Sequence, residues 1–72
     1  MSPSILRELW AVVESTQSST LLTLDDQRLA KVLVDTVSLG HPLTTEESDS
    51  LQHYIQSRVS LIRDLATSRY AA

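Results

Sequence analysis

Residues 44–70 form the longest segment of the chain whose apolar residues recur with the period of an α-helix. At 100° per residue, these apolar side chains fall within one arc of roughly 160°. The arc consists of Leu51, Tyr54, Ile55, Val59, Leu61, Ile62, Leu65 and Ala66. Thr44 and Glu47 have the spacing of a capping box, which marks a helix start. The pattern predicts one continuous amphipathic helix over about residues 45–70, whose apolar face must be buried against another element.

A second amphipathic segment starts with a Ser-Pro pair at positions 2–3. Ser can cap free amides, and Pro at the first helical position loses no hydrogen bond. The apolar stripe of this segment consists of Ile5, Leu6, Leu9, Trp10, Val12 and Val13. The following STQSST, residues 15–20, suits a helix or a loop, but a continued helix returns downstream leucines to the same face. We therefore predict a helix over about residues 3–22; the alternative is a helix that ends near Glu14, followed by a serine-rich linker.

The middle of the chain predicts a helix over about residues 26–39. Asp25 is a good N-cap residue, and Gly40 can adopt the left-handed conformation that ends many helices. Pro42 prevents the helix from continuing. The predicted apolar face consists of Leu29, Val32, Leu33, Val37 and Leu39. Because the connection to the next helix is short, the two helices should be spatial neighbours.

The length and composition of the chain fit one small domain. A chain of 72 residues without cysteine can bury only a modest core and cannot use disulfides, so self-association is the commonest source of further stability. The net charge of −3 argues against a nucleic-acid backbone as the main partner. No apolar run is long enough to span a membrane and no signal peptide is evident, so we expect a soluble, cytoplasmic protein.

The predicted helices have unequal lengths. Helices of about 20, 14 and 25 residues would measure about 30, 21 and 38 Å. We predict an all-α fold, a three-helix bundle or helical hairpin with a long C-terminal helix, in which the end of that helix extends beyond its neighbours. The apolar surface left uncovered there should be covered by another chain, most simply in a homodimer.

Arg58 lies near the centre of the apolar arc of residues 44–70, and Arg69 lies close to the same line. A charged residue there costs desolvation unless it reaches water or a carboxylate. In one interpretation Arg58 extends to water while its aliphatic stem packs. In the other it fixes the register of an assembly by pairing with an acidic residue of another chain or with one of three acids in its own chain, namely Glu8, Glu14 and Asp35.

Site chemistry is sparse in this sequence. Asp49 and His53 are helical neighbours that could share a metal ion, but two ligands on an exposed face make a weak site, and a solvated first turn is the simpler interpretation. There is no cysteine, no nucleophile motif and no glycine-rich phosphate loop. We therefore expect neither enzymatic activity nor a cofactor.

These features favour a non-catalytic protein–protein interaction module, such as an adaptor, assembly factor or regulator. The predicted partner-binding residues are Arg58, Leu61, Ile62, Leu65, Arg69 and Trp10. For Trp10, however, the commoner role at such a position is to fill the core with its indole nitrogen at the margin. The alternative function is a helix-turn-helix-like regulator that binds nucleic acid, although the start of its second helix, residues 44–49, is acidic.

The segments SILRELWAVVE and SRVSLIRDLA resemble short helical proteins of unassigned function from cyanobacteria. This resemblance extends over most of the chain without a signature motif. It implies a cytoplasmic accessory protein and identifies no functional residues.

Overall fold

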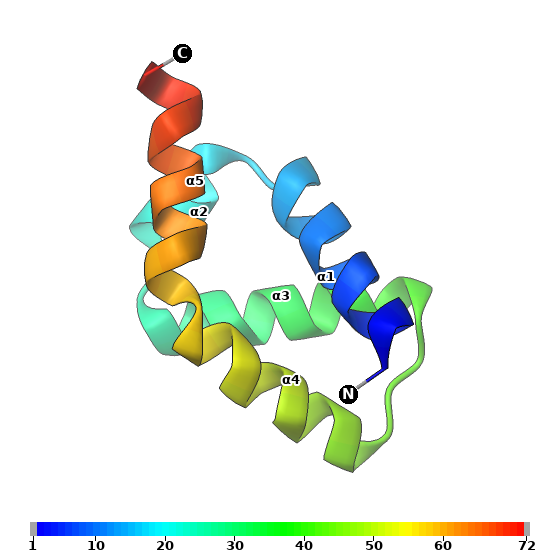
Figure 1. Ribbon diagram of the computed structural model, residues 1–72. Helices are drawn as coiled ribbons and strands as arrows, with labels where there is room; N and C mark the ends of the chain where they lie inside the picture. Colours follow the sequence, from blue (N-terminus) through cyan, green and yellow to red (C-terminus); the bar gives the residue numbers. More distant parts are fainter. Residues whose placement is uncertain (1, 72) are drawn as a thin grey trace.

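The computed structural model describes residues 2–71, and all regular secondary structure in this range is α-helical (Figure 1). This confirms the predicted all-α class. The described part of the chain forms five helices: α1 (Pro3–Ser15), α2 (Ser18–Thr23), α3 (Asp26–Gly40), α4 (Thr45–Ser57) and α5 (Val59–Ala71).

Side-chain caps mark the starts of α1, α3 and α4, as the sequence predicts. Ser2 and Asp25 each accept a hydrogen bond from the amide three residues later, at 3.3 and 2.8 Å. At α4, the Thr44 hydroxyl accepts from the Glu47 amide at 3.1 Å, and the Glu47 carboxylate accepts from the Thr44 amide at 2.9 Å. Each cap satisfies amides that have no partner within the helix, which makes these starts readable from local sequence.

The predicted helix over residues 3–22 is divided. Thr16 and Gln17 are extended, with ψ angles of 139° and 140°, and they separate α1 from α2. The Thr16 hydroxyl donates to the Val12 carbonyl at 2.7 Å, and the Thr16 amide donates to the same oxygen at 3.0 Å. Such side-chain bonds to a preceding carbonyl compete with helix continuation. The alternative prediction of a helix that ends near Glu14 is confirmed, since α1 ends at Ser15. The serine-rich linker that was to follow is reduced to Thr16 and Gln17, because α2 begins at Ser18.

The predicted helix over residues 45–70 is likewise divided, at Arg58. This residue has φ −115° and ψ 10°, and its amide donates to the Ile55 carbonyl at 2.9 Å instead of to a carbonyl four residues back. Figure 1 shows α4 and α5 meeting at an angle, so that α5 runs beside α2. α2 is the main packing partner of α5. Contacts between α5 and α2 therefore replace the straight extension that the periodicity predicts.

The end of α3 also differs from its prediction. The helix includes Gly40, whose φ is not positive, and its C-terminal cap is His41, with φ −148°. A Cβ atom at Gly40 would lie 3.3 Å from Oε1 of Glu8 on α1. The glycine therefore permits close approach of a side chain from another helix, and it does not make the left-handed turn that was expected.

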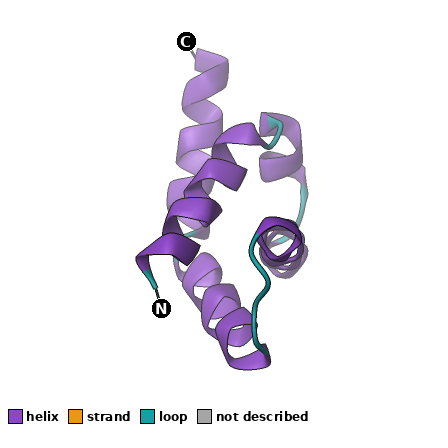
Figure 2. Ribbon diagram, turned by 90° about the vertical axis from the view of Figure 1, so that its right-hand side faces the viewer, coloured by secondary structure: helices purple, strands orange, loops and turns teal. Residues whose placement is uncertain are grey.

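One continuous hydrophobic core joins the helices. In Figure 2, where α3 is seen nearly end-on, α1, α4 and α5 lie on one side of it. The core consists of Ile5, Leu9, Val12, Val13, Leu21, Leu29, Ala30, Leu33, Val34, Val37, Leu51, Ile55, Val59, Ile62 and Ala66. On α3, Ala30 and Val34 are buried, whereas Val32 and Leu39 are 39% and 87% exposed. The predicted α3 face is therefore wrong at those two positions.

Candidate interaction surface on the C-terminal helix

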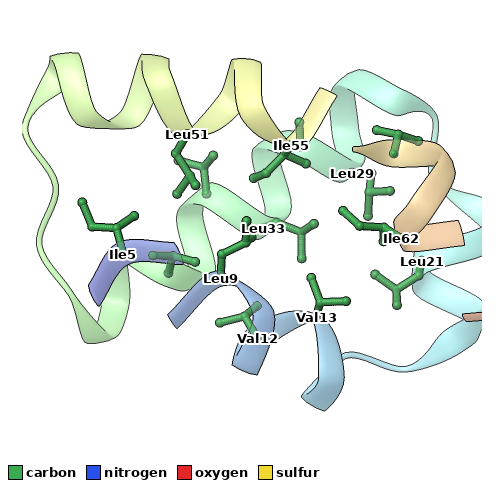
Figure 3. Packing of buried hydrophobic residues seen from close by; sticks show 14 of the residues in the cluster. Ile5, Leu9, Val12, Val13, Leu21, Leu29, Leu33, Leu51, Ile55 and Ile62 are labelled. Carbon is green, nitrogen blue, oxygen red and sulfur yellow. The ribbon is translucent and has the colours of Figure 1, made fainter. Parts of the chain in front are cut away.

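The inner face of α5 is fully enclosed within a single copy of the chain. Ile62 and Ala66 are both 0% exposed, and Val59 at the start of the helix is 5% exposed. Figure 3 shows Ile62 pointing toward Leu21 of α2. No other chain is needed to cover these three residues, because the angle at Arg58 brings α5 onto its own core. For the same reason Ile62 is unavailable as a partner-binding residue in this conformation. The predicted homodimer stays a prediction.

Two of the predicted partner-binding leucines lie outside the core. Leu61 is 46% exposed and Leu65 is 43% exposed. They are four residues apart on one helix, so their side chains are neighbours on its surface. Arg58 precedes Leu61 by three residues and is also exposed. We call these three residues, Arg58, Leu61 and Leu65, the outer flank of α5.

Arg58 forms a cation–π contact at the start of the outer flank. Its guanidinium carbon lies 5.1 Å from the ring centroid of Tyr54, which is half-buried against the core. Among the described residues the ion pairs are Arg28 with Asp25 and Arg63 with Asp26, so the predicted intrachain partners of Arg58 do not bind it. Arg58 is exposed to water, as the first interpretation has it, but the group shown to pack is the guanidinium and not the aliphatic stem. Pairing with an acidic residue of another chain stays a prediction.

Arg69, predicted to contact a partner, instead binds the end of α1. Its guanidinium donates to the Val13 carbonyl at 2.9 Å and to the Thr16 carbonyl at 2.8 Å. These oxygens lie where the helix ends, and terminal carbonyls lack partners within a helix. Arg69 thus joins the last helix to the first.

Arg63, which lies outside the predicted apolar arc of residues 44–70, has a similar role at α2. Its guanidinium donates to the carbonyls of Leu21 and Leu24, at 2.9 and 2.7 Å, and to Oδ1 of Asp26 at 2.9 Å. Sequence reasoning missed this residue. The available signal was indirect: no Lys or Arg lies between Arg7 and Arg28, so a cationic donor to a helix end in that range comes from elsewhere in the chain.

Trp10, the sixth predicted partner-binding residue, is half-buried and packs against the core. This position fits the interpretation of a core filler with a polar margin. Trp10 therefore offers a partner less surface than the leucines of the outer flank.

The remaining surface of residues 2–71 has no enclosed site. No pocket is present over this range, and no three His, Asp or Glu side chains in it gather closely enough to hold a metal ion. None of the described helices has the length and apolar character needed to cross a membrane. The outer flank of α5 is a candidate site because two exposed apolar side chains lie one helical turn apart beside a cation, whereas the exposed Val32 and Leu39 of α3 are seven residues apart.

No protein-family model matches the chain, and neither the curated proteins nor the solved structures include a significant match to it.

Proposed function

We propose that this protein is a non-catalytic protein–protein interaction module, acting as an adaptor, assembly factor or regulator, and that it docks through the outer flank of α5. The observation that carries this proposal is the exposure of Leu61 and Leu65 on a helix whose opposite face is fully buried. Two neighbouring leucines beside an arginine fit the buried centre of an interface, which is more apolar than the rest of the surface and in which Arg is enriched.

The two faces of α5 have separate roles in this proposal. Ile62 and Ala66 attach the helix to the domain, so its backbone is fixed before a partner arrives. A preorganised helix loses less conformational entropy on binding than a flexible segment. The outer flank fits the mode in which helices pack through residues three and four positions apart, and Arg58 favours an acidic residue at the edge of the partner surface.

The test compares binding by the wild type with binding by Leu61→Asp and Leu65→Asp. A pull-down from source lysate with quantitative mass spectrometry should identify proteins that the wild type retains and both variants lose. Val32→Asp is a matched control, since Val32 is an apolar residue of similar exposure, 39%, on a different helix, α3. Circular dichroism should show that all three variants keep the helical content of the wild type. Equal retention of every protein by Leu65→Asp and Val32→Asp would contradict the proposal.

The alternative, a nucleic-acid-binding regulator, has weaker support. The start of α4 carries Glu46 and Glu47 in its first turn, where a recognition helix would face phosphates. Of the arginines that could compensate, Arg63 and Arg69 already donate to backbone carbonyls of their own chain. A salt-dependent mobility shift of duplex DNA or RNA would favour this alternative over protein docking.

A further inference from the structure

The junction at Arg58 interrupts a segment that has the local features of a continuous helix. Residues 44–71 contain neither Gly nor Pro, the usual causes of a sharp break. The buried residues keep helical spacing across the junction, at Leu51, Ile55, Val59, Ile62 and Ala66. Arg58 also has no side-chain oxygen with which to cap the free amides of α5. The one local feature at the junction is Ser57, whose hydroxyl donates to the Tyr54 carbonyl at 2.7 Å. Thr36 and Thr67 make similar bonds inside unbroken helices, so this bond alone does not end α4.

The break also leaves backbone hydrogen bonds unmade. Across it, the Arg58 amide donates to Ile55 at 2.9 Å and the Ile62 amide donates to Arg58 at 3.0 Å. In a straight α-helix the amides of residues 59–61 would each donate to the carbonyl four residues earlier. Straightening would thus complete the helix backbone, at the cost of removing α5 from its site.

Tertiary contacts hold the bent form. Ile62 is fully buried in the core, Arg63 binds the end of α2, and Arg69 binds the end of α1. These contacts all lie beyond the junction, and each could be made equally well by an α5 that belongs to another copy of the chain. Exchange of an identical element is a low-cost route to a dimer because the contacts that are lost are formed again.

We propose that α4 and α5 straighten at Arg58, and that the α5 of each copy then occupies the α5 site of the other, giving a domain-swapped dimer. Ile62 of one copy contacts Leu21 of the other, and the two arginines bind the helix ends of the other copy. Monomer and dimer differ in the backbone at Arg58, which is bent in the monomer and helical in the dimer. The α5 contacts are common to both. The exchange uses only the backbone of Arg58, as the hinge, and does not depend on the exposed side chains of Leu61 and Leu65, so the proposed docking function can fail without affecting it.

Ser60→Pro tests the hinge. Ser60 is exposed in the first turn of α5, where Pro is tolerated, whereas in a continuous helix its ring would clash with the carbonyl of residue 56. Size-exclusion chromatography with light scattering should find a concentration-dependent dimer for the wild type and for the matched control Ser60→Ala. For Ser60→Pro the dimer dissociation constant should rise by about 100-fold or more.

The double variant R63Q/R69Q tests the exchange itself. Its arginine contacts are lost equally from monomer and dimer, so the dissociation constant of the dimer should stay within about threefold of wild type. Because these contacts hold α5 in its site, exchange between monomer and dimer should be at least about tenfold faster. Exchange is measured by mixing fluorophore-labelled and unlabelled protein.

Three results would overturn the swap. The first is a wild type that remains monomeric at millimolar concentration, and the second is a Ser60→Pro variant that dimerises as tightly as Ser60→Ala. The third is loss of the dimer in L61S/L65S, which would assign the dimer interface to the outer flank. Circular dichroism measures the helical content of each variant. If R63Q/R69Q is unfolded, the measurements on Ser60→Pro and L61S/L65S test the proposal.

Discussion

Arg69 donates a hydrogen bond to the carbonyl oxygen of Val13, 56 residues earlier in the chain, at 2.9 Å. With the bond from Arg69 to Thr16, this contact supplies donors to the end of α1, a helix that has no basic residue in its own last turn. Arg63 does the same at α2. The C-terminal helix therefore completes two earlier helices through side chains, as well as adding Ile62 and Ala66 to the core.

Arg63→Gln should lower the free energy of unfolding by about 2–3 kcal/mol, because it removes several charge-assisted hydrogen bonds from a side chain that is only 26% exposed. Arg69→Gln should cost less, about 1–2 kcal/mol, because the residue is exposed near the chain end. Urea denaturation gives both values. The control is Arg7→Gln, an exposed arginine on α1, which should stay within about 0.5 kcal/mol of wild type. If all three variants behaved alike, the helix-end contacts would have no energetic role.

Asp26→Asn should have little effect, although Asp26 forms an ion pair with Arg63 at 2.9 Å. The carboxylate is 70% exposed, and a pair of this kind contributes about 0–1 kcal/mol. Arg63 keeps its bonds to the two backbone carbonyls in this variant. Denaturation at low and high salt measures the difference, and a loss comparable to that of Arg63→Gln would show that the ion pair is the dominant contact.

Ile62→Ala and Leu61→Ala should differ strongly despite their adjacent positions. Ile62 is completely buried, so its truncation leaves a cavity and should cost about 2–5 kcal/mol. Leu61 is 46% exposed, so its truncation should cost less than about 1 kcal/mol. Thermal unfolding by circular dichroism compares the two. Similar losses would mean that α5 is rotated relative to the orientation described.

Thr44→Ala should destabilise the protein by about 1 kcal/mol, because it removes the hydroxyl that accepts from the Glu47 amide. Thr45→Ala, one position later and inside the first turn of α4, should change stability by less than about 0.5 kcal/mol. Chemical denaturation distinguishes them. Equal effects would mean that the capping box contributes nothing.

Gly40→Ala should stabilise the protein by about 0.5–1 kcal/mol, since Ala is the better helix former and Gly40 lies within α3 without a positive φ. The new methyl group would lie 3.3 Å from Oε1 of Glu8, the flexible end of a side chain that can move aside. The midpoint of urea denaturation measures the change. A loss of stability would show that the approach of α1 to α3 requires glycine.

Local sequence predicted the parts of the fold that depend on neighbouring residues. The helix starts at Pro3, Asp26 and Thr45 follow capping residues whose side chains bond to amides within the same turn. The apolar periodicity predicted that Leu61 and Ile62 share one exposed interface. A face of that width does not determine which of the two side chains is buried. At α3 the same ambiguity led to Leu39 in place of Val34.

By itself, the sequence of this protein determined that the chain is helical, where three of its helices start and which residues are available to a core, because these follow from bonds and periodicities within a few turns. At Thr16 the sequence left a continued helix and a helix end open, and the structure decided between them. Only the tertiary structure decided that the chain bends at Arg58, and which flank of α5 meets solvent. The physical reason is that α5 lies against α2, and the bonds from Arg63 and Arg69 to carbonyls far away in sequence compensate for the helix backbone that is interrupted at Arg58.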